Sequence, residues 1–94
     1  MSRQLVYKRH AMRRMASRDI EAFHIEQAIA IGEIIETYPT DYPYPSRLIL
    51  IFTSSRPIHV VAADNPENSE TYIITAYEPE PAEWDSSFKR RIKS

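Results

Sequence analysis

Three residues near the start of the chain have the types and the spacing of a phosphate-binding site. His10, Arg14 and Arg18 recur at every fourth position, so a helix that reaches Arg18 places all three on one face. The planar guanidinium group of arginine binds two phosphate oxygens at once, and histidine titrates near neutrality and can transfer a proton. In the structural alternative, His10 caps the helix or faces solvent, and the two arginines form ion pairs within the chain. The candidate acids for those ion pairs are Glu21, Glu36 and Asp41.

His59 and Tyr77 complete a scheme for cleaving RNA without a metal ion. Such cleavage needs a base for the ribose 2′-hydroxyl, an acid for the leaving 5′-oxygen, and cations that stabilise the charged phosphorane. His10 and His59 are the candidates for proton transfer, and Tyr77 can act as the acid, donate a hydrogen bond or stack on a base. We therefore predict that His10, Arg14, Arg18, His59 and Tyr77 are catalytic. The alternative is that His59 is a structural histidine of an apolar strand and that Tyr77 serves packing.

Four more residues are candidates for substrate binding: Arg13, Arg56, Thr75 and Arg90. Arg56 lies in the turn before His59, where it can make a second phosphate contact. Arg13 and Arg90 suit the RNA backbone, although such residues also occur on solvated helix faces. No metal or cofactor is predicted, because the three histidines lack ligand spacing and the acids do not cluster at a ligand period.

The charge of the chain is divided between its ends and its middle. Residues 1–18 hold six basic groups and no acid, and residues 89–94 hold four more. Residues 19–88 hold all thirteen acids against two arginines, and the whole chain has a net charge of −1. A near-neutral total argues against a general nucleic-acid binder, but two basic ends that meet in space would form a local positive patch.

The length and composition predict one small domain over residues 1–94. No repeat or Gly/Ser linker divides its 94 residues. The chain has no cysteine, and no apolar run approaches the roughly 20 residues of a membrane span. We therefore expect a cytoplasmic protein that does not associate with a membrane.

The pattern of apolar residues predicts an α+β fold with two N-terminal helices, a four-stranded antiparallel sheet and a C-terminal helix. Gly32 fits the left-handed position that ends many helices, and short turns join the last three strands as a meander. For Asp41, Tyr38, Tyr42 and Tyr44, we predict only that they order the proline-rich segment. The predicted elements are helices over 9–17 and 22–31, strands over 33–38, 47–54, 57–64 and 71–77, and a closing helix with Trp84, Phe88, Arg91 and Ile92 on one side.

Four stretches together resemble a known bacterial family: HAMRRMASRDI, GEIIETYPTDYPYPS, RPIHVV and IITAYEPEPAEW. The chain is similar to the domain-of-unknown-function family numbered 4258, from about residue 10 to residue 84. Members resemble the RelE/ParE and BrnT toxins in their small α+β architecture, and they are often encoded beside antitoxin-like proteins, including YgiT-type zinc-finger proteins. The chain departs from the strongly basic character of RelE-type toxins. The family's motif positions in this sequence are His10, Arg14, Arg18, Arg56, His59, Thr75, Tyr77 and Trp84.

The resemblance and the residues together give three hypotheses. The first is a toxin of the RelE/BrnT type that cleaves mRNA without a metal ion and is bound by a cognate antitoxin, such as a YgiT-type zinc-finger protein. The second is a non-catalytic binding module of toxin-like fold that docks a protein partner through a sheet edge or a basic patch. In the third, the arginines and histidines form a structural hydrogen-bond network.

Overall fold

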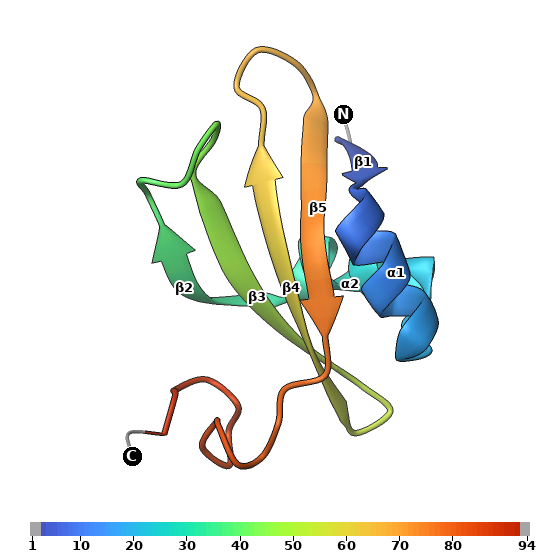
Figure 1. Ribbon diagram of the computed structural model, residues 1–94, viewed down its shortest axis with the longest axis vertical. Helices are drawn as coiled ribbons and strands as arrows, with labels where there is room; N and C mark the ends of the chain where they lie inside the picture. Colours follow the sequence, from blue (N-terminus) through green and yellow to red (C-terminus); the bar gives the residue numbers. More distant parts are fainter. Residues whose placement is uncertain (1–2, 93–94) are drawn as a thin grey trace.

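A single five-stranded sheet is the framework of the protein. The computed structural model describes residues 3–92, and both helices lie to one side of the sheet (Figure 1). In chain order the elements are β1 (Gln4–Tyr7), α1 (Arg9–Ser17), α2 (Ala22–Ile31), β2 (Glu33–Tyr38), β3 (Ser46–Thr53), β4 (Arg56–Asp64) and β5 (Glu70–Tyr77).

The sheet is mixed, and the predicted four-stranded antiparallel sheet is therefore wrong. The strand order is β1-β5-β4-β3-β2, with β1 parallel to β5 and every other pair antiparallel. The four strands of the meander are present where the apolar pattern predicted them. The fifth strand, β1, has only four residues, and its pairing with β5 joins Gln4 to Glu70 across most of the chain. A run this short has no periodicity by which the sequence could reveal it.

Both predicted N-terminal helices are confirmed, but the predicted conformation of Gly32 is wrong. Gly32 is extended, with φ of −69° and ψ of 162°, so no left-handed turn ends α2. A side chain is excluded here by the close approach of β3. A Cβ atom on Gly32 would lie 2.4 Å from Ile49 Cγ2 and 2.5 Å from the carbonyl oxygen of Ala28. The only glycine of the chain therefore marks a crowded junction.

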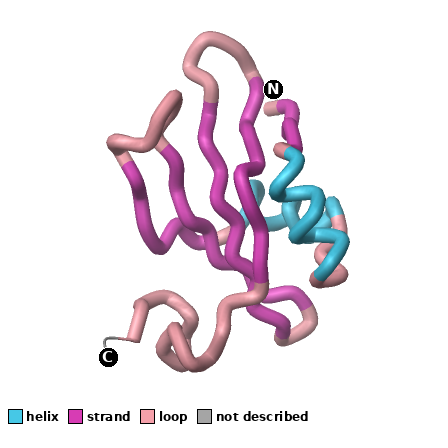
Figure 2. Tube along the Cα trace, viewed as in Figure 1, coloured by secondary structure: helices cyan, strands magenta, loops and turns pink. Residues whose placement is uncertain are grey.

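The predicted C-terminal helix is also wrong, because residues 78–92 form turns and a short hairpin-like loop (Figure 2). Trp84 and Arg91 make an isolated antiparallel bridge. Between them, Asp85 Oδ1 accepts hydrogen bonds from the backbone N–H groups of Ser87 and Lys89 at 3.1 and 3.2 Å. A short acidic side chain that binds nearby backbone donors competes with helix formation. Phe88, with φ of 61°, is left-handed and also incompatible with a helix.

The two faces of the sheet have different coverings. The face toward the helices forms the main apolar core, with Ile25 and Ala28 of α2 and Ile58 and Val60 of β4 fully or almost fully buried. The opposite face, here called the second face, carries rows of residues that are paired across the strands. These rows are Glu33–Leu50–His59–Tyr77, Glu36–Leu48–Val61–Thr75 and Tyr38–Ser46–Ala63–Tyr72.

Neither helix within residues 3–92 has the length and apolar character needed to cross a bilayer.

Candidate functional site

Three arginines from the two ends of the chain line one pocket beside the last turn of α1. Arg14 and Arg18 come from α1 and its C-cap, and Arg91 comes from the C-terminal loop. Tyr77, at the end of β5, and Trp84 provide aromatic walls. We call this pocket, with a volume of about 190 Å³, the arginine pocket. The sequence predicted that the basic ends could form a local patch, and these three side chains do meet.

Three carboxylates line the same pocket and oppose its positive charge. They belong to Glu78, Glu80 and Glu83. Glu78 is already paired, because its Oε1 lies 2.8 Å from Nε of Arg56. The other two acids leave the pocket with nearly balanced charge, which fits a ligand held by defined contacts better than one held by a strong overall field.

Arg14 is positioned inside this pocket without a fixed partner. Its Nε is buried and makes no hydrogen bond in the part of the chain that the structure describes. The five ion pairs found within residues 3–92 also leave out Arg14 and Arg18, so the proposed pairing with Glu21, Glu36 or Asp41 is not observed there. A buried guanidinium nitrogen without a partner is costly, which makes Arg14 a candidate ligand-binding group.

His59 lies behind the arginine pocket with its ring closed off from solvent. Its exposed fraction is 0%, and Trp84 covers it edge-on with 4.5 Å between ring centroids. Nε2 lies 2.8 Å from the carbonyl oxygen of Phe88, and Nδ1 lies 3.3 Å from the hydroxyl oxygen of Tyr77. Because a carbonyl only accepts, Nε2 carries the hydrogen and Nδ1 accepts the hydroxyl hydrogen of Tyr77. His59 therefore orients the phenol that reaches the pocket.

Burial sets the protonation of both members of this pair. Desolvation lowers the pKa of His59 from 6.5, although its hydrogen bond to Phe88 opposes that change. Desolvation raises the pKa of Tyr77, while the charge of Arg91 acts in the opposite direction. At neutral pH the pair is therefore a neutral imidazole and a neutral phenol.

The C-terminal loop is fixed to the second face by several contacts around Arg91. The guanidinium of Arg91 stacks over Trp84 at 4.6 Å from its ring centroid, and Arg91 Nε lies 3.4 Å from Glu36 Oε2. Glu36 also accepts a hydrogen bond from Tyr38, whose pKa is raised to about 12, first by desolvation and then by this bond. Lys89 Nζ lies 3.0 Å from Glu33 Oε1. These contacts connect the loop to β2, which lies on the opposite edge of the sheet from β1. Glu33 and Glu36 of β2 are on the same face of the sheet as Tyr77.

Other predicted site residues lie outside the arginine pocket. His10 and Arg13 are exposed on α1 and are not among the residues that line it. Arg90 is exposed, and its carbonyl oxygen accepts a hydrogen bond from the backbone N–H of Asp85. Thr75 lies on the second face, where its hydroxyl group is buried and has no partner in the described chain.

Arg56 has a structural environment. Besides its contact with Glu78, it donates a 2.9 Å hydrogen bond to the carbonyl oxygen of Asp19 and another bond to the carbonyl oxygen of Arg18. These bonds join the start of β4 to the turn between the helices and occupy its guanidinium group. Arg56 thereby fixes the backbone beneath Arg18.

The sequence did not single out Arg91 as a site residue. It lies in the basic C-terminal run, and its helical spacing from Trp84 and Phe88 made it a helix residue in the prediction. The loop geometry brings it back to Trp84 instead. The concentration of basic residues at both ends of the chain was the available signal for its role.

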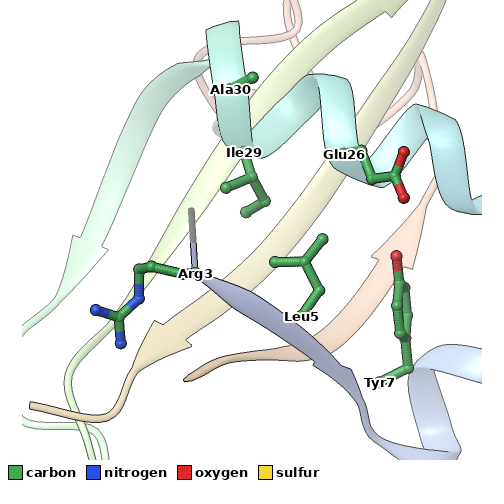
Figure 3. Close-up of a pocket in the computed structure, with 6 residues that line it drawn as sticks. All are labelled: Arg3, Leu5, Tyr7, Glu26, Ile29 and Ala30. Carbon is green, nitrogen blue, oxygen red and sulfur yellow. The ribbon is translucent and has the colours of Figure 1, made fainter. Parts of the chain in front are cut away.

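Two further pockets have different chemistry. A larger one, of about 570 Å³, lies between β1 and α2. Leu5 and Ile29 face each other across it, the hydroxyl of Tyr7 and the carboxylate of Glu26 point toward each other, and Arg3 points away (Figure 3). A pocket of about 260 Å³ lies at the other end of the second face, and we call it the tyrosine pocket. Tyr42, Tyr44 and Tyr72 line it together with Lys8 and Asp41.

Within residues 3–92, no three histidine or acidic side chains are grouped closely enough to hold a metal ion.

Comparison with known proteins assigns the chain to a family. A family model described as Domain of unknown function (DUF4258) matches residues 7–78, more than half of the chain. The chain belongs to this family. No curated protein and no solved structure matches it in the corresponding searches.

The DUF4258 region does not contain the whole arginine pocket. It includes Arg14, Arg18 and Tyr77, whereas Trp84 and Arg91 lie beyond its end at residue 78. The part of the pocket within the family match is thus Arg14, Arg18, Tyr77 and Glu78.

Proposed function

We propose that this protein is a toxin-like ribonuclease that cleaves mRNA without a metal ion and is bound by a cognate antitoxin protein. The arginine pocket is its proposed active site. The observation that carries the proposal is the convergence there of Arg14, Arg18 and Tyr77, three residues with the chemistry that RNA cleavage requires. A YgiT-type zinc-finger protein is our candidate for the antitoxin.

The proposed mechanism assigns the arginines to the scissile phosphate. Arg14, Arg18 and Arg91 bind the phosphate oxygens and stabilise the negative charge that grows on the phosphorane. Tyr77 keeps its proton at neutral pH. To act as the acid, its hydroxyl turns from His59 Nδ1 toward the leaving 5′-oxygen when substrate enters the pocket that Tyr77 lines. His59 acts as a positioning residue, since its Nδ1 accepts the hydrogen bond that orients Tyr77.

His10 is the proposed general base. It precedes Arg14 by four residues on α1, so both side chains project from the same face of the helix. Its ring is exposed, whereas the ring of His59 is buried with both nitrogens bonded. We therefore assign removal of the ribose 2′-hydroxyl proton to His10, the histidine that a substrate can reach.

The acidic lining favours a second candidate function. Glu80 and Glu83 would repel a phosphate, but they suit a basic side chain of a protein partner. In this alternative the protein is a non-catalytic module that docks a partner. The two functions differ in whether the protein cleaves RNA.

Purified protein incubated with single-stranded RNA tests the proposal. We expect cleavage in the presence of a chelator, with 2′,3′-cyclic phosphate ends, and about a 100-fold loss of rate in Arg18→Ala, as when one charge-stabilising donor is removed. Arg14→Ala and His10→Ala are expected to show comparable losses. Arg9→Ala is the matched control, because Arg9 is exposed on the same helix and does not line the pocket.

Thermal unfolding of each variant separates catalysis from folding. Arg18 is exposed, so its substitution is expected to leave the melting temperature unchanged. Absence of cleavage by the wild-type protein, or equal rates in Arg9→Ala and Arg18→Ala, would contradict the ribonuclease proposal and favour the binding module.

A further inference from the structure

We infer that the tyrosine pocket binds a nucleobase of the RNA strand whose phosphate occupies the arginine pocket. The link between the two pockets rests on the proposed function, whereas the chemistry of the tyrosine pocket stands on its own lining. The ligand class is an unpaired base of single-stranded RNA.

The aromatic rings of this pocket are arranged to stack on a planar ligand. Tyr44 and Tyr72 are already stacked on each other, with 5.8 Å between ring centroids and 13° between planes. Tyr42 also lines the pocket and is 95% exposed, so it is available to cover a bound base. Single-stranded RNA is recognised through bases that stack on such side chains.

A positive charge stands beside the rings, where the nucleotide's phosphate would lie. Lys8 lines the pocket, and its Nζ lies 4.7 Å from the centroid of Tyr72. Lys8 is also the N-cap of α1, and no side chain within residues 3–92 makes a capping hydrogen bond at this helix end. The positive end of the helix dipole therefore adds to the charge of Lys8.

Hydrogen bonds hold the polar lining in place before any ligand binds. The Tyr72 hydroxyl donates to Glu70 Oε1 at 3.2 Å and accepts from Asn65 Nδ2 at 3.3 Å. Asp41 accepts a hydrogen bond from Ser46 through Oδ2. Its other carboxylate oxygen can accept hydrogen bonds from N–H groups on the edge of a base. This contact would select bases that carry such N–H groups, a distinction that aromatic stacking alone does not make.

Both pockets lie along the second face of the sheet. His59 and Tyr77 belong to the row behind the arginine pocket, and Ala63 and Tyr72 belong to the row that lines the tyrosine pocket. The two rows lie four positions apart along β4, a span of about 13 Å that a short oligonucleotide can bridge. Thr75, whose buried hydroxyl group has no partner among residues 3–92, occupies the row between them.

Basic side chains of α1 and its two caps lie beside both pockets. Lys8, at the start of the helix, contacts the tyrosine pocket, and Arg14 and Arg18, near its end, contact the arginine pocket. One strand of RNA that runs along β5 beside α1 would therefore meet cations for its backbone and tyrosines for a base. The loop with Tyr42 and Tyr44, predicted only to be ordered, provides the base-binding wall.

Calorimetric titration with a trinucleotide tests the inference. A 2′-O-methyl trinucleotide cannot be cleaved through its 2′-oxygen, and a matched abasic trinucleotide lacks only the bases. We expect the abasic ligand to bind wild-type protein about tenfold more weakly, because stacking of one base contributes roughly this factor. Tyr42→Ala and Tyr44→Ala should weaken binding of the base-containing trinucleotide by a similar factor and leave the abasic ligand unaffected.

The control is Phe23→Ala, which removes a half-exposed aromatic ring of α2 outside the pocket. Tyr42→Ala is the decisive variant, since a residue that is 95% exposed is not needed for folding. Equal binding of the two trinucleotides to wild-type protein, unchanged binding in Tyr42→Ala and Tyr44→Ala, or no binding at all would overturn the inference.

The outcomes also distinguish this inference from the proposed function. RNA that is cleaved normally by Tyr42→Ala and Tyr44→Ala, with unchanged trinucleotide affinity, would leave the ribonuclease standing and remove the base pocket. Tyrosine-dependent binding without any cleavage of RNA would support the base pocket and contradict the ribonuclease.

Discussion

At His59, burial and hydrogen bonding limit what the side chain can do. Both ring nitrogens are bonded, and Trp84 separates the ring from solvent. A general base must reach the proton that it removes, and neither nitrogen is open to a substrate here. The second consequence of burial is energetic, because the folded protein must keep this ring neutral.

The stability of the fold should therefore decrease with acid through His59. The pKa of His59 is lowered from 6.5 by burial, so the unfolded chain takes up this proton at a higher pH than the folded protein does. The stability that comes from keeping His59 neutral is fully present above about pH 6.5. It is lost as the pH falls toward the pKa of His59 in the folded protein, at no more than about 1.4 kcal/mol per pH unit. Urea unfolding between pH 8 and pH 5 measures this slope.

The matched variants for that measurement are His59→Gln and His10→Gln. His59→Gln cannot take up the proton, so its free energy of unfolding should depend less steeply on pH below 6.5. His10→Gln removes an exposed histidine and should keep the wild-type slope. Identical slopes in wild type and His59→Gln would show that burial of His59 does not contribute to the pH dependence.

At the scale of the elements, local patterns predicted more than long-range pairing did. The helices of Arg9–Ser17 and Ala22–Ile31 and the four meander strands follow from periods that are contained within each segment. The pairing of β1 and the loop of residues 78–92 depend on partners far along the chain. Trp84, Phe88 and Arg91 had helical spacing, but Asp85 binds the backbone donors that a helix would use.

The candidate site was predictable in its chemistry but less so in its geometry. The i, i+4 spacing placed Arg14 and Arg18 together, and the structure adds Tyr77 to their pocket. The burial of His59 depends on the loop that carries Trp84 across it. That arrangement is a tertiary contact, and alternation along β4 gives only the face of the sheet on which His59 lies.

The junction between α2 and β2 gives a test of close packing. Gly32→Ala would place a methyl group 2.5 Å from the Ala28 carbonyl oxygen and 2.4 Å from Ile49 Cγ2. Because the carbonyl belongs to the helix backbone, relief requires a shift of α2 against β3. We expect a loss of about 1–3 kcal/mol in the free energy of unfolding, measured in urea. A variant as stable as wild type would mean that the junction adjusts freely.

For the whole molecule, local charge matters more than net charge. The total is −1, yet three arginines meet in one pocket because the two ends of the chain approach each other there. Binding of a single RNA strand through three cations releases few counterions. The protein should therefore bind RNA with a weak dependence on salt, unlike a strongly basic RNA-binding protein.

Titration with uncleavable RNA at several salt concentrations measures this dependence. For phosphate contacts with Arg14, Arg18 and Arg91, the logarithm of the affinity should fall with the logarithm of salt concentration with a slope of about −2, and a further contact with Lys8 would make the slope about −3. Arg18→Ala should reduce the slope by about 0.7, and Arg9→Ala should leave it unchanged. A wild-type slope several times steeper would indicate that RNA lies over the wider basic surface and not in the arginine pocket.

The loop of residues 78–92 also determines where a shortened form of this protein can end. The family match stops at residue 78, but Trp84, at 2% exposure, and Arg91 belong to the same folded body as β4 and β2. Expression of the matched region alone would uncover the His59 ring and the apolar row around Leu50. For work on relatives, a boundary set at the end of sequence similarity would open the wall of the site and turn a buried surface into one prone to aggregation.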